Sequence, residues 1–231
     1  MREQFRLGEL GLIQMHQYRI DQLSIRLTED ITWRLREISA YRRAINSSDQ
    51  IRADALLRGS VPLLYAHWEG YFNVACSLYL GFVAEIGVTT DKLKPNFWAI
   101  TQLQRKNADS IKSERDLYNL LCDLRSAPDR VFRRGRHAKI TGRSNLNAKT
   151  LATGLEFLGL DSSSTDAYSD FLDQKLLPDR NFIAHGESLT IDESKFDDYR
   201  NGVIELMRLL KNEIENAASQ KEYLKPEEEG H

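Results

Sequence analysis

A helical repeat of apolar residues dominates this chain of 231 residues and restricts its fold more than any other feature. From about residue 16 to 46, apolar side chains recur at steps of three, four or seven, the spacing of one α-helix face. A second run begins after a cap at Ser48 or Asp49, and another covers about 193–218. The predicted buried faces are Ile20, Leu23, Leu27, Ile31, Leu35, Ile38 and Ile45; Leu57, Val61, Leu64, Tyr65, Trp68, Phe72, Cys76 and Tyr79; and Phe196, Tyr199, Val203, Leu206, Met207, Leu210 and Ile214.

Punctuating residues divide the rest of the chain. Pro62 should kink the second helix or mark a restart, whereas Pro178 should interrupt a helical segment over about 166–185 that ends at Gly186. Loop-forming residues separate short predicted helices at about 96–104, 112–125 and 147–158. The sequence therefore predicts an all-α fold: one bundle of four long helices over 1–222, with a partly helical insertion at about 88–165 and a flexible tail, 223–231.

Composition narrows the class of protein. Hydrophobic residues make up 41% of the chain, charged residues 29%, and the net charge is -2, so any nucleic-acid affinity must come from a local patch. No apolar run approaches the ~20 residues needed to span a bilayer, and the first residues lack the apolar segment of a signal peptide. We expect a cytoplasmic protein that does not enter membranes, with Cys76 and Cys122 as reduced core thiols.

Residues 176–187, Leu-Leu-Pro-Asp-Arg-Asn-Phe-Ile-Ala-His-Gly-Glu, combine an arginine and a histidine five positions apart. The permanently charged fork of Arg180 can hold a phosphate, and His185 can take or give a proton near neutral pH. On a regular helix this offset turns about 140°, so the two meet only if the helix is irregular or ends between them. The structural alternative is Arg180 paired with Asp179 or Glu187 and a histidine that closes the helix. The apolar residues expected to hold the segment in the core are Phe182, Ile183 and Ala184.

Arg180 and His185 resemble the motif of the HEPN superfamily, an arginine followed after four to six residues by a histidine. The first intervening residue in that motif is usually polar, and here it is Asn181. A second stretch over residues 65–72, Tyr-Ala-His-Trp-Glu-Gly-Tyr-Phe, is similar to the second-helix signature of HEPN-like nucleases from bacterial toxin and defence loci. The helix order fits that family over roughly 18–88 and 166–218.

The resemblance implies cleavage of single-stranded RNA without metal or cofactor, by attack of a ribose 2′-OH on the adjacent phosphate. Arg180, His185 and Asn181 would be the catalytic residues, with Asn181 orienting the histidine or contacting the phosphate. A single histidine does not readily act as general base and general acid in the same step. Members of the family therefore dimerise, which brings two Arg/His pairs into one cleft. We therefore expect a homodimer whose interface is lined by residues 180–187, acting as a toxin or defence effector with an antitoxin or defence-system partner.

Two further groups of residues are candidates for a role in the site. Glu69 and Asn73 lie four apart on one helix face; Glu69 could brace Arg180 or the motif backbone, or be a solvated or capping carboxylate. His67 is expected off the core face. Residues 124–149 carry eight cations against Asp129 alone, which predicts RNA contact or, alternatively, a solvated loop or a docking patch for an acidic antitoxin. The predicted RNA-binding residues are Arg130, Arg133, Arg134, Arg136, Lys139 and Arg143.

Other kinds of site are not indicated. Zinc-type Cys/His spacing is absent, acidic residues are scattered, and residues 142–150 lack the glycine and lysine of a phosphate loop, so neither a metal nor a cofactor is expected. The alternative function is a non-catalytic HEPN-type module that binds RNA, nucleotide or a partner protein, and a third is an antitoxin-like scaffold. Catalysis requires Arg180 and His185 to be exposed in a shared cleft; a binding module does not.

Overall fold

The computed structural model describes residues 2–97, 99–100, 115, 131–132 and 145–226. Regular structure within these ranges is helical, and the only strand-like features there are two isolated bridges, Thr89–Val131 and Leu93–Leu224. The all-α prediction is confirmed. The helices are α1 (Arg2–Asn46), α2 (Gln50–Ile86), α5 (Ala148–Leu158), the 3₁₀ helix η2 (Ser163–Tyr168), the π-helix η3 (Phe171–Leu176), α6 (Leu177–Ala184) and α7 (Glu193–Ser219).

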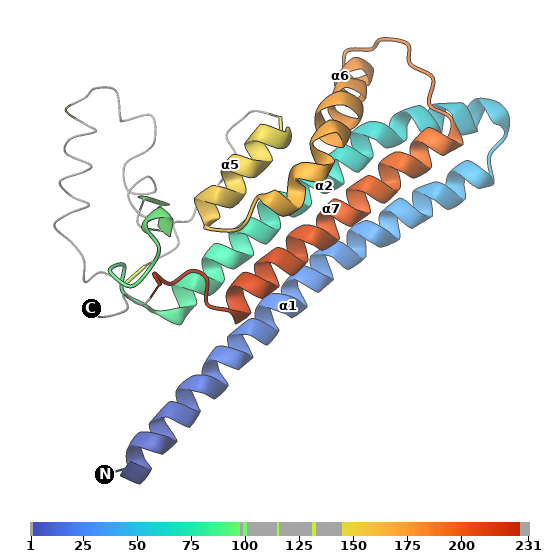
Figure 1. Cartoon of the computed structure of the whole chain (residues 1–231). Helices are drawn as coiled ribbons and strands as arrows, with labels where there is room; N and C mark the ends of the chain where they lie inside the picture. The colour runs from blue at the N-terminus through green and yellow to red at the C-terminus, as the bar shows by residue number, and fades with distance from the viewer. Residues whose placement is uncertain (1, 98, 101–114, 116–130, 133–144, 227–231) are drawn as a thin grey trace.

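The long helices α1, α2 and α7 pack against one another, and α6 lies against α2 (Figure 1). Every residue predicted for the buried faces of α2 and α7 is buried, because α2 contacts all three other helices. On α1 the predicted face is buried except at Ile20 and Leu35, which are partly buried. Cys76 is a buried free thiol, as predicted, and Cys122 lies outside the described residues. Across the described ranges, no helix has the length and apolar character that crossing a bilayer requires.

The ends of α1 and α2 differ in part from the predictions. α1 begins at Arg2 rather than near residue 16, and its first turns project beyond the other helices (Figure 1). Ile13 and Met15 are exposed there, so the buried periodicity that reveals a helix stops before this segment. Asp49 is the N-cap of α2 and accepts from the backbone N–H of Arg52 at 3.0 Å. α2 then runs through Pro62 without a restart.

The segment before the arginine–histidine motif is more irregular than predicted. Instead of one helix broken at Pro178, it contains η2, then η3, which continues directly into α6. Pro178 lies in the first turn of α6, where its missing N–H would have no helical partner. The packing of η3 depends on Gly202 of α7, because a Cβ there would lie 2.5 Å from Cζ of the Phe171 ring. Gly186 ends the motif segment as predicted, with a φ of 82°.

The flexible tail was predicted to begin at residue 223, but the first residues of that range are packed against the bundle. Tyr223 is buried and its ring packs against Phe82, with 5.9 Å between ring centroids. Its carbonyl accepts from the backbone N–H of Lys94 at 2.9 Å, and the N–H of Lys225 donates to Lys92. Residues 223–225 therefore belong to the packed structure, while 227–231 lie outside the described residues. Of the short helices predicted in the insertion, α5 is confirmed, and the other two fall largely outside the described ranges.

His67 lies in the α1–α2 interface, contrary to the prediction that it is off the core face. The residue is 3% exposed, and its Nε2 lies 3.1 Å from Oε2 of Glu37. The ring meets the edge of Trp33, with centroids 5.5 Å apart. Burial lowers the pKa of His67 by more than the carboxylate of Glu37 raises it. The packed histidine is therefore neutral near pH 7.

A histidine kept neutral by folding makes stability depend on pH. Because the pKa of His67 is lower in the folded chain, the unfolded chain takes up protons first, from about pH 6.5 downward. The free energy of unfolding should be fully maintained above that pH and should fall as the pH drops below it. His67→Gln should make this fall less steep in chemical denaturation series from about pH 7.5 to 5. Part of the fall should persist in His67→Gln, because burial also lowers the pKa of His16. Equal slopes for both proteins would refute this role of His67.

Candidate active site

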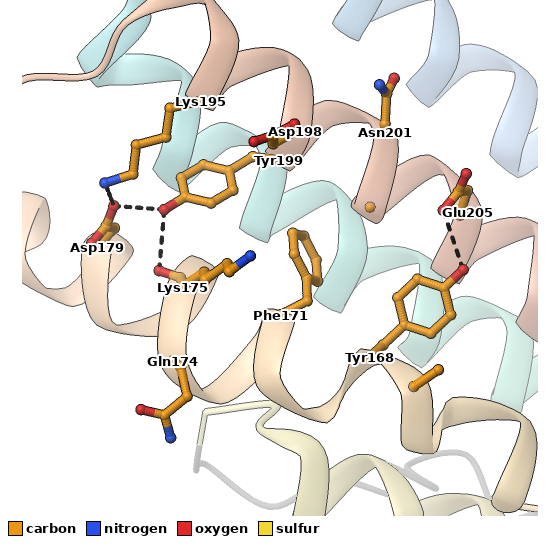
Figure 2. A pocket seen from close by; sticks show the side chains of 12 residues that line it. Tyr168, Phe171, Gln174, Lys175, Asp179, Lys195, Asp198, Tyr199, Asn201 and Glu205 are labelled. Carbon is orange, nitrogen blue, oxygen red and sulfur yellow. Dashed lines mark hydrogen bonds and ion pairs between the residues drawn. The ribbon is translucent and has the colours of Figure 1, made fainter.

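The orientation of α6 is fixed by the residue that precedes Arg180. Oδ2 of Asp179 accepts a hydrogen bond from the hydroxyl of Tyr199 at 2.7 Å and lies 2.7 Å from Nζ of Lys195, both on α7 (Figure 2). These two contacts attach the start of α6 to α7. Burial and this carboxylate raise the pKa of Tyr199, so its hydroxyl remains a proton donor. Asp179 is therefore committed to α7 and does not pair with Arg180.

Arg180 points toward α2 and is held by neutral groups. Its guanidinium carbon lies 4.6 Å from the centre of the Tyr65 ring. Its Nη1 donates to the side-chain oxygen of Asn181 at 2.8 Å and to that of Asn145 at 3.2 Å. In the part of the chain that the structure describes, no carboxylate forms an ion pair with Arg180. The structural alternative of an Arg180–Asp179 or Arg180–Glu187 pair is therefore wrong.

His185 is exposed at the end of α6. Its backbone N–H donates to the carbonyl of Asn181 at 2.9 Å, which continues the helical bonding pattern as far as the histidine. Since the helix is regular between Arg180 and His185, their side chains point about 140° apart. The irregular turn, η3, precedes the motif instead of lying within it. One chain alone therefore does not bring the two groups to a common point.

Asn181 has a different role from the one first considered. Its side chain accepts from Arg180, not from the histidine, and only its main-chain carbonyl contacts His185. Phe182 and Ala184 are exposed, contrary to the prediction that they lie in the core, while Ile183 is half-buried. The reason is that α6 is short and packs mainly against α2, so its other residues remain exposed. The side that carries Phe182 remains an apolar surface next to His185, with Phe182 41% exposed.

Tyr65 connects the motif to the inside of the bundle. Its hydroxyl accepts from the backbone N–H of Leu146 at 2.7 Å, and the carboxylate of Glu69 lies close enough to influence its pKa. Burial raises the pKa of Tyr65, and the negative charge of Glu69 raises it further. The structure thus places Glu69 behind Tyr65 and not directly on Arg180. The side-chain amide of Asn73 donates to the backbone carbonyl of Glu69 at 2.9 Å.

The signature at residues 65–72 serves several faces of α2. Tyr65 lies under Arg180, whereas Trp68 and Phe72 belong to the core. Gly70 faces α1, where a Cβ would lie 2.8 Å from Nη1 of Arg34. The guanidinium of Arg34 needs that space because it is buried and donates to the carbonyl of His67 at 3.2 Å. Most of this signature therefore holds the helices together, and its first residue contacts the motif.

The basic run is described only in part. Its six predicted RNA-binding residues lie outside the described residues. Phe132, which interrupts the run, is buried and packs against Phe97 with ring centroids 5.7 Å apart, so this aromatic ring belongs to the core. Asn145 is a site residue that the sequence did not indicate, because its contact with Arg180 joins positions 35 apart. The positions left undescribed are Arg130, Arg133, Arg134, Arg136, Lys139 and Arg143.

A groove of about 620 Å³ lies between η2, η3 and α7 (Figure 2). None of the predicted catalytic residues lines it. Several of its polar groups bond to one another: Lys195 pairs with Asp179, and the Tyr168 hydroxyl donates to Glu205 at 3.2 Å. Because the contacts of Asp179 in this groove attach α6 to α7, we assign the groove a role in holding α6 and place the candidate active site at Arg180 and His185.

Comparison with known proteins agrees with the two stretches described above. The sequence model of a protein family described as HEPN_MAE_28990-like HEPN matches residues 23–223. The matched span includes all of α2, α6 and α7, and therefore both the signature at residues 65–72 and the motif from Arg180 to His185. No curated protein and no solved structure matches the chain significantly.

Proposed function

Because the chain belongs to the HEPN_MAE_28990-like HEPN family, we propose that it is a metal-independent endoribonuclease for single-stranded RNA, with Arg180 and His185 as catalytic residues. Membership of this family indicates a nuclease-like or RNA-related role. The observation that carries the finer proposal is the environment of Arg180. Two amide oxygens and an aromatic ring hold its guanidinium, and none of them neutralises its charge. A fixed, unneutralised guanidinium is suited to bind a phosphate.

The proposed reaction needs only this chain's side chains. A neutral His185 takes the proton of a ribose 2′-OH, and the 2′-oxygen attacks the adjacent phosphorus. Arg180 stabilises the charge that grows on the phosphate oxygens. The bond from phosphorus to the 5′-oxygen then breaks, and a protonated His185 of a second copy gives that oxygen its proton. The products are a 2′,3′-cyclic phosphate end and a 5′-hydroxyl end.

The geometry of α6 favours a site shared between two copies. In one chain Arg180 points toward α2, whereas His185 is exposed and, by helix geometry, lies about 140° around α6 from Arg180. A second copy related by a two-fold axis would supply the missing groups to one cleft. The exposed ring of Phe182, three residues before His185, provides apolar surface for that contact.

Phe182→Asp tests this dimer. The substitution places a charge where the proposed interface buries an aromatic ring, so the protein should become monomeric at micromolar concentration. RNA cleavage should fall in parallel. Sedimentation velocity and cleavage rates would measure both effects. Ile51→Asp, at an isoleucine of α2 that is 83% exposed, is the matched control and should leave both unchanged. A Phe182→Asp protein that is monomeric and fully active would refute the shared site.

The experiment that tests the proposed function uses purified protein and a 5′-labelled single-stranded RNA in excess EDTA. The expected result is cleavage that leaves 2′,3′-cyclic phosphate ends, identified by mass spectrometry, and a rate at least about 10²-fold lower with His185→Ala. Intact RNA, or cleavage that EDTA abolishes, would overturn the proposal. In cells we propose that the protein acts in the cytoplasm as a toxin or defence effector restrained by a partner. Expression of the active protein, but not His185→Ala, should then degrade RNA and arrest growth.

One observation favours a second function, a non-catalytic module that binds RNA. Within a chain, Arg180 and His185 are directed apart, and binding does not need them to meet. The two functions separate in the assay above. A binding module should retain labelled RNA on native gels without cutting it, and its affinity should depend on Arg180 but not on His185.

A further inference from the structure

The chain that leaves the insertion is attached to the bundle directly beside Arg180. The backbone N–H of Leu146 donates to the Tyr65 hydroxyl at 2.7 Å, and the Leu146 side chain is fully buried. Two residues on, the backbone N–H of Ala148 donates to Oδ1 of Asp173 at 2.8 Å. Asn147 caps α5 by accepting from the N–H of Thr150. Asn145 is thus presented from a backbone held at several points.

The side chain of Asn145 is exposed, and its oxygen is already hydrogen-bonded. That oxygen accepts from Nη1 of Arg180 at 3.2 Å, so the amide –NH₂ of Asn145 is directed away from the guanidinium. Nη1 uses its two hydrogens on Asn145 and Asn181. The Nε and Nη2 hydrogens of Arg180 form the edge that binds a phosphate in two places. Among the described residues, neither this edge nor the –NH₂ group of Asn145 has a hydrogen-bond partner, so both can bind to an anion that approaches Arg180.

We propose that Asn145 is a further substrate-binding residue, which donates through its amide to the phosphate held by Arg180, with Tyr65 as the positioning residue that holds it there. This inference rests on the proposed function, since it assigns one more contact to the same site. An asparagine fits this place because it accepts from Arg180 without neutralising it and still offers a donor to an anion. Asn145 also belongs to the cation-rich segment 124–149, so the site residue and the predicted RNA-binding residues share one piece of chain.

Asn145→Asp separates substrate binding from a structural role. An aspartate keeps the acceptor for Arg180 and strengthens it, so a purely structural contact would survive, with an unchanged or raised midpoint of thermal unfolding. Against a phosphate, the same change removes a donor and adds a negative charge. The affinity for a 2′-O-methyl single-stranded RNA, which is not cleaved, should fall by at least about tenfold. Asn145→Ala, which loses both the donor and the acceptor for Arg180 but adds no charge, should have a smaller effect in the same direction.

Controls and outcomes separate this inference from the proposed function. Asn201→Asp adds the same charge at an exposed position of α7 and should leave RNA affinity unchanged. Tyr65→Phe keeps the ring under Arg180 but removes the acceptor for Leu146, and should weaken RNA binding to the extent of Asn145→Ala. If the wild type binds RNA without cutting it and Asn145→Asp still weakens binding, the nuclease proposal fails and the inference stands. If the wild type cuts RNA while Asn145→Asp retains full affinity and rate, the inference is overturned alone.

Discussion

His185→Ala should slow RNA cleavage by about 10²- to 10⁴-fold, the range expected for loss of a general acid–base group. The imidazole is exposed and its backbone alone bonds to Asn181, so the fold should remain intact. Single-turnover rates with a saturating protein concentration would measure the chemical step separately from binding. The midpoint of thermal unfolding should match that of the wild type. A variant that cuts RNA at the wild-type rate would mean that His185 takes no part in the reaction.

Arg180 should show an effect of similar size with a different profile. Arg180→Ala should lower the rate by about 10²- to 10³-fold and weaken RNA binding, because the proposed role of the guanidinium is to contact the phosphate in both ground and transition states. Arg180→Lys restores the charge but not the fork that bonds to Asn145 and Asn181, so most of the loss should persist. Arg52→Ala, at an exposed arginine, is the matched control. Full rescue by lysine would argue against a role for the fork.

Trp68→Ala should have the largest effect on stability. Trp68 is fully buried in the middle of α2 and packs on Phe72, with ring centroids 6.0 Å apart. Its truncation should lower the free energy of unfolding by about 3–5 kcal/mol, a large share of the total for a domain of this kind. Chemical denaturation followed by circular dichroism would measure the change.

Two comparison variants make this result specific. Ile51→Ala removes apolar atoms from a side chain that is 83% exposed and should change the free energy of unfolding by less than about 0.5 kcal/mol. Trp68→Phe keeps an aromatic ring and should cost less than Trp68→Ala. A loss below about 1 kcal/mol for Trp68→Ala would show that α2 is not the central helix of the bundle.

The positions of helices could be predicted from the sequence where a helix buries one face, and could not where a helix has no buried face. Periodicity located α7 to within a residue at each end and the buried side of α2, since both helices contact several neighbours. It missed the first turns of α1, whose described side chains at Ile13 and Met15 are exposed. It also missed η3, whose Phe171 ring packs on Gly202, 31 positions later in the chain, a contact that no local pattern indicates.

The candidate site divides in the same way. Arg180 and His185 were identifiable because their spacing is a local feature of the sequence. The groups around them were not, since Tyr65 and Asn145 reach Arg180 across 115 and 35 positions. His67 shows the limit of reading one helix by itself. It lies outside the main apolar stripe of α2 but is buried by α1, which places Glu37 and Trp33 against it.

The central claim is that two copies of the chain complete one RNA-cleaving cleft, and mixing wild type with His185→Ala tests it most directly. The two proteins would be combined at one to ten, exchanged by mild unfolding and refolding, and assayed at constant wild-type concentration. If each cleft needs both histidines, random pairing should lower the activity per wild-type chain by about tenfold. The control excess is a protein that carries both Phe182→Asp and His185→Ala, which should not pair. Activity that is unchanged by the His185→Ala excess would contradict the shared cleft.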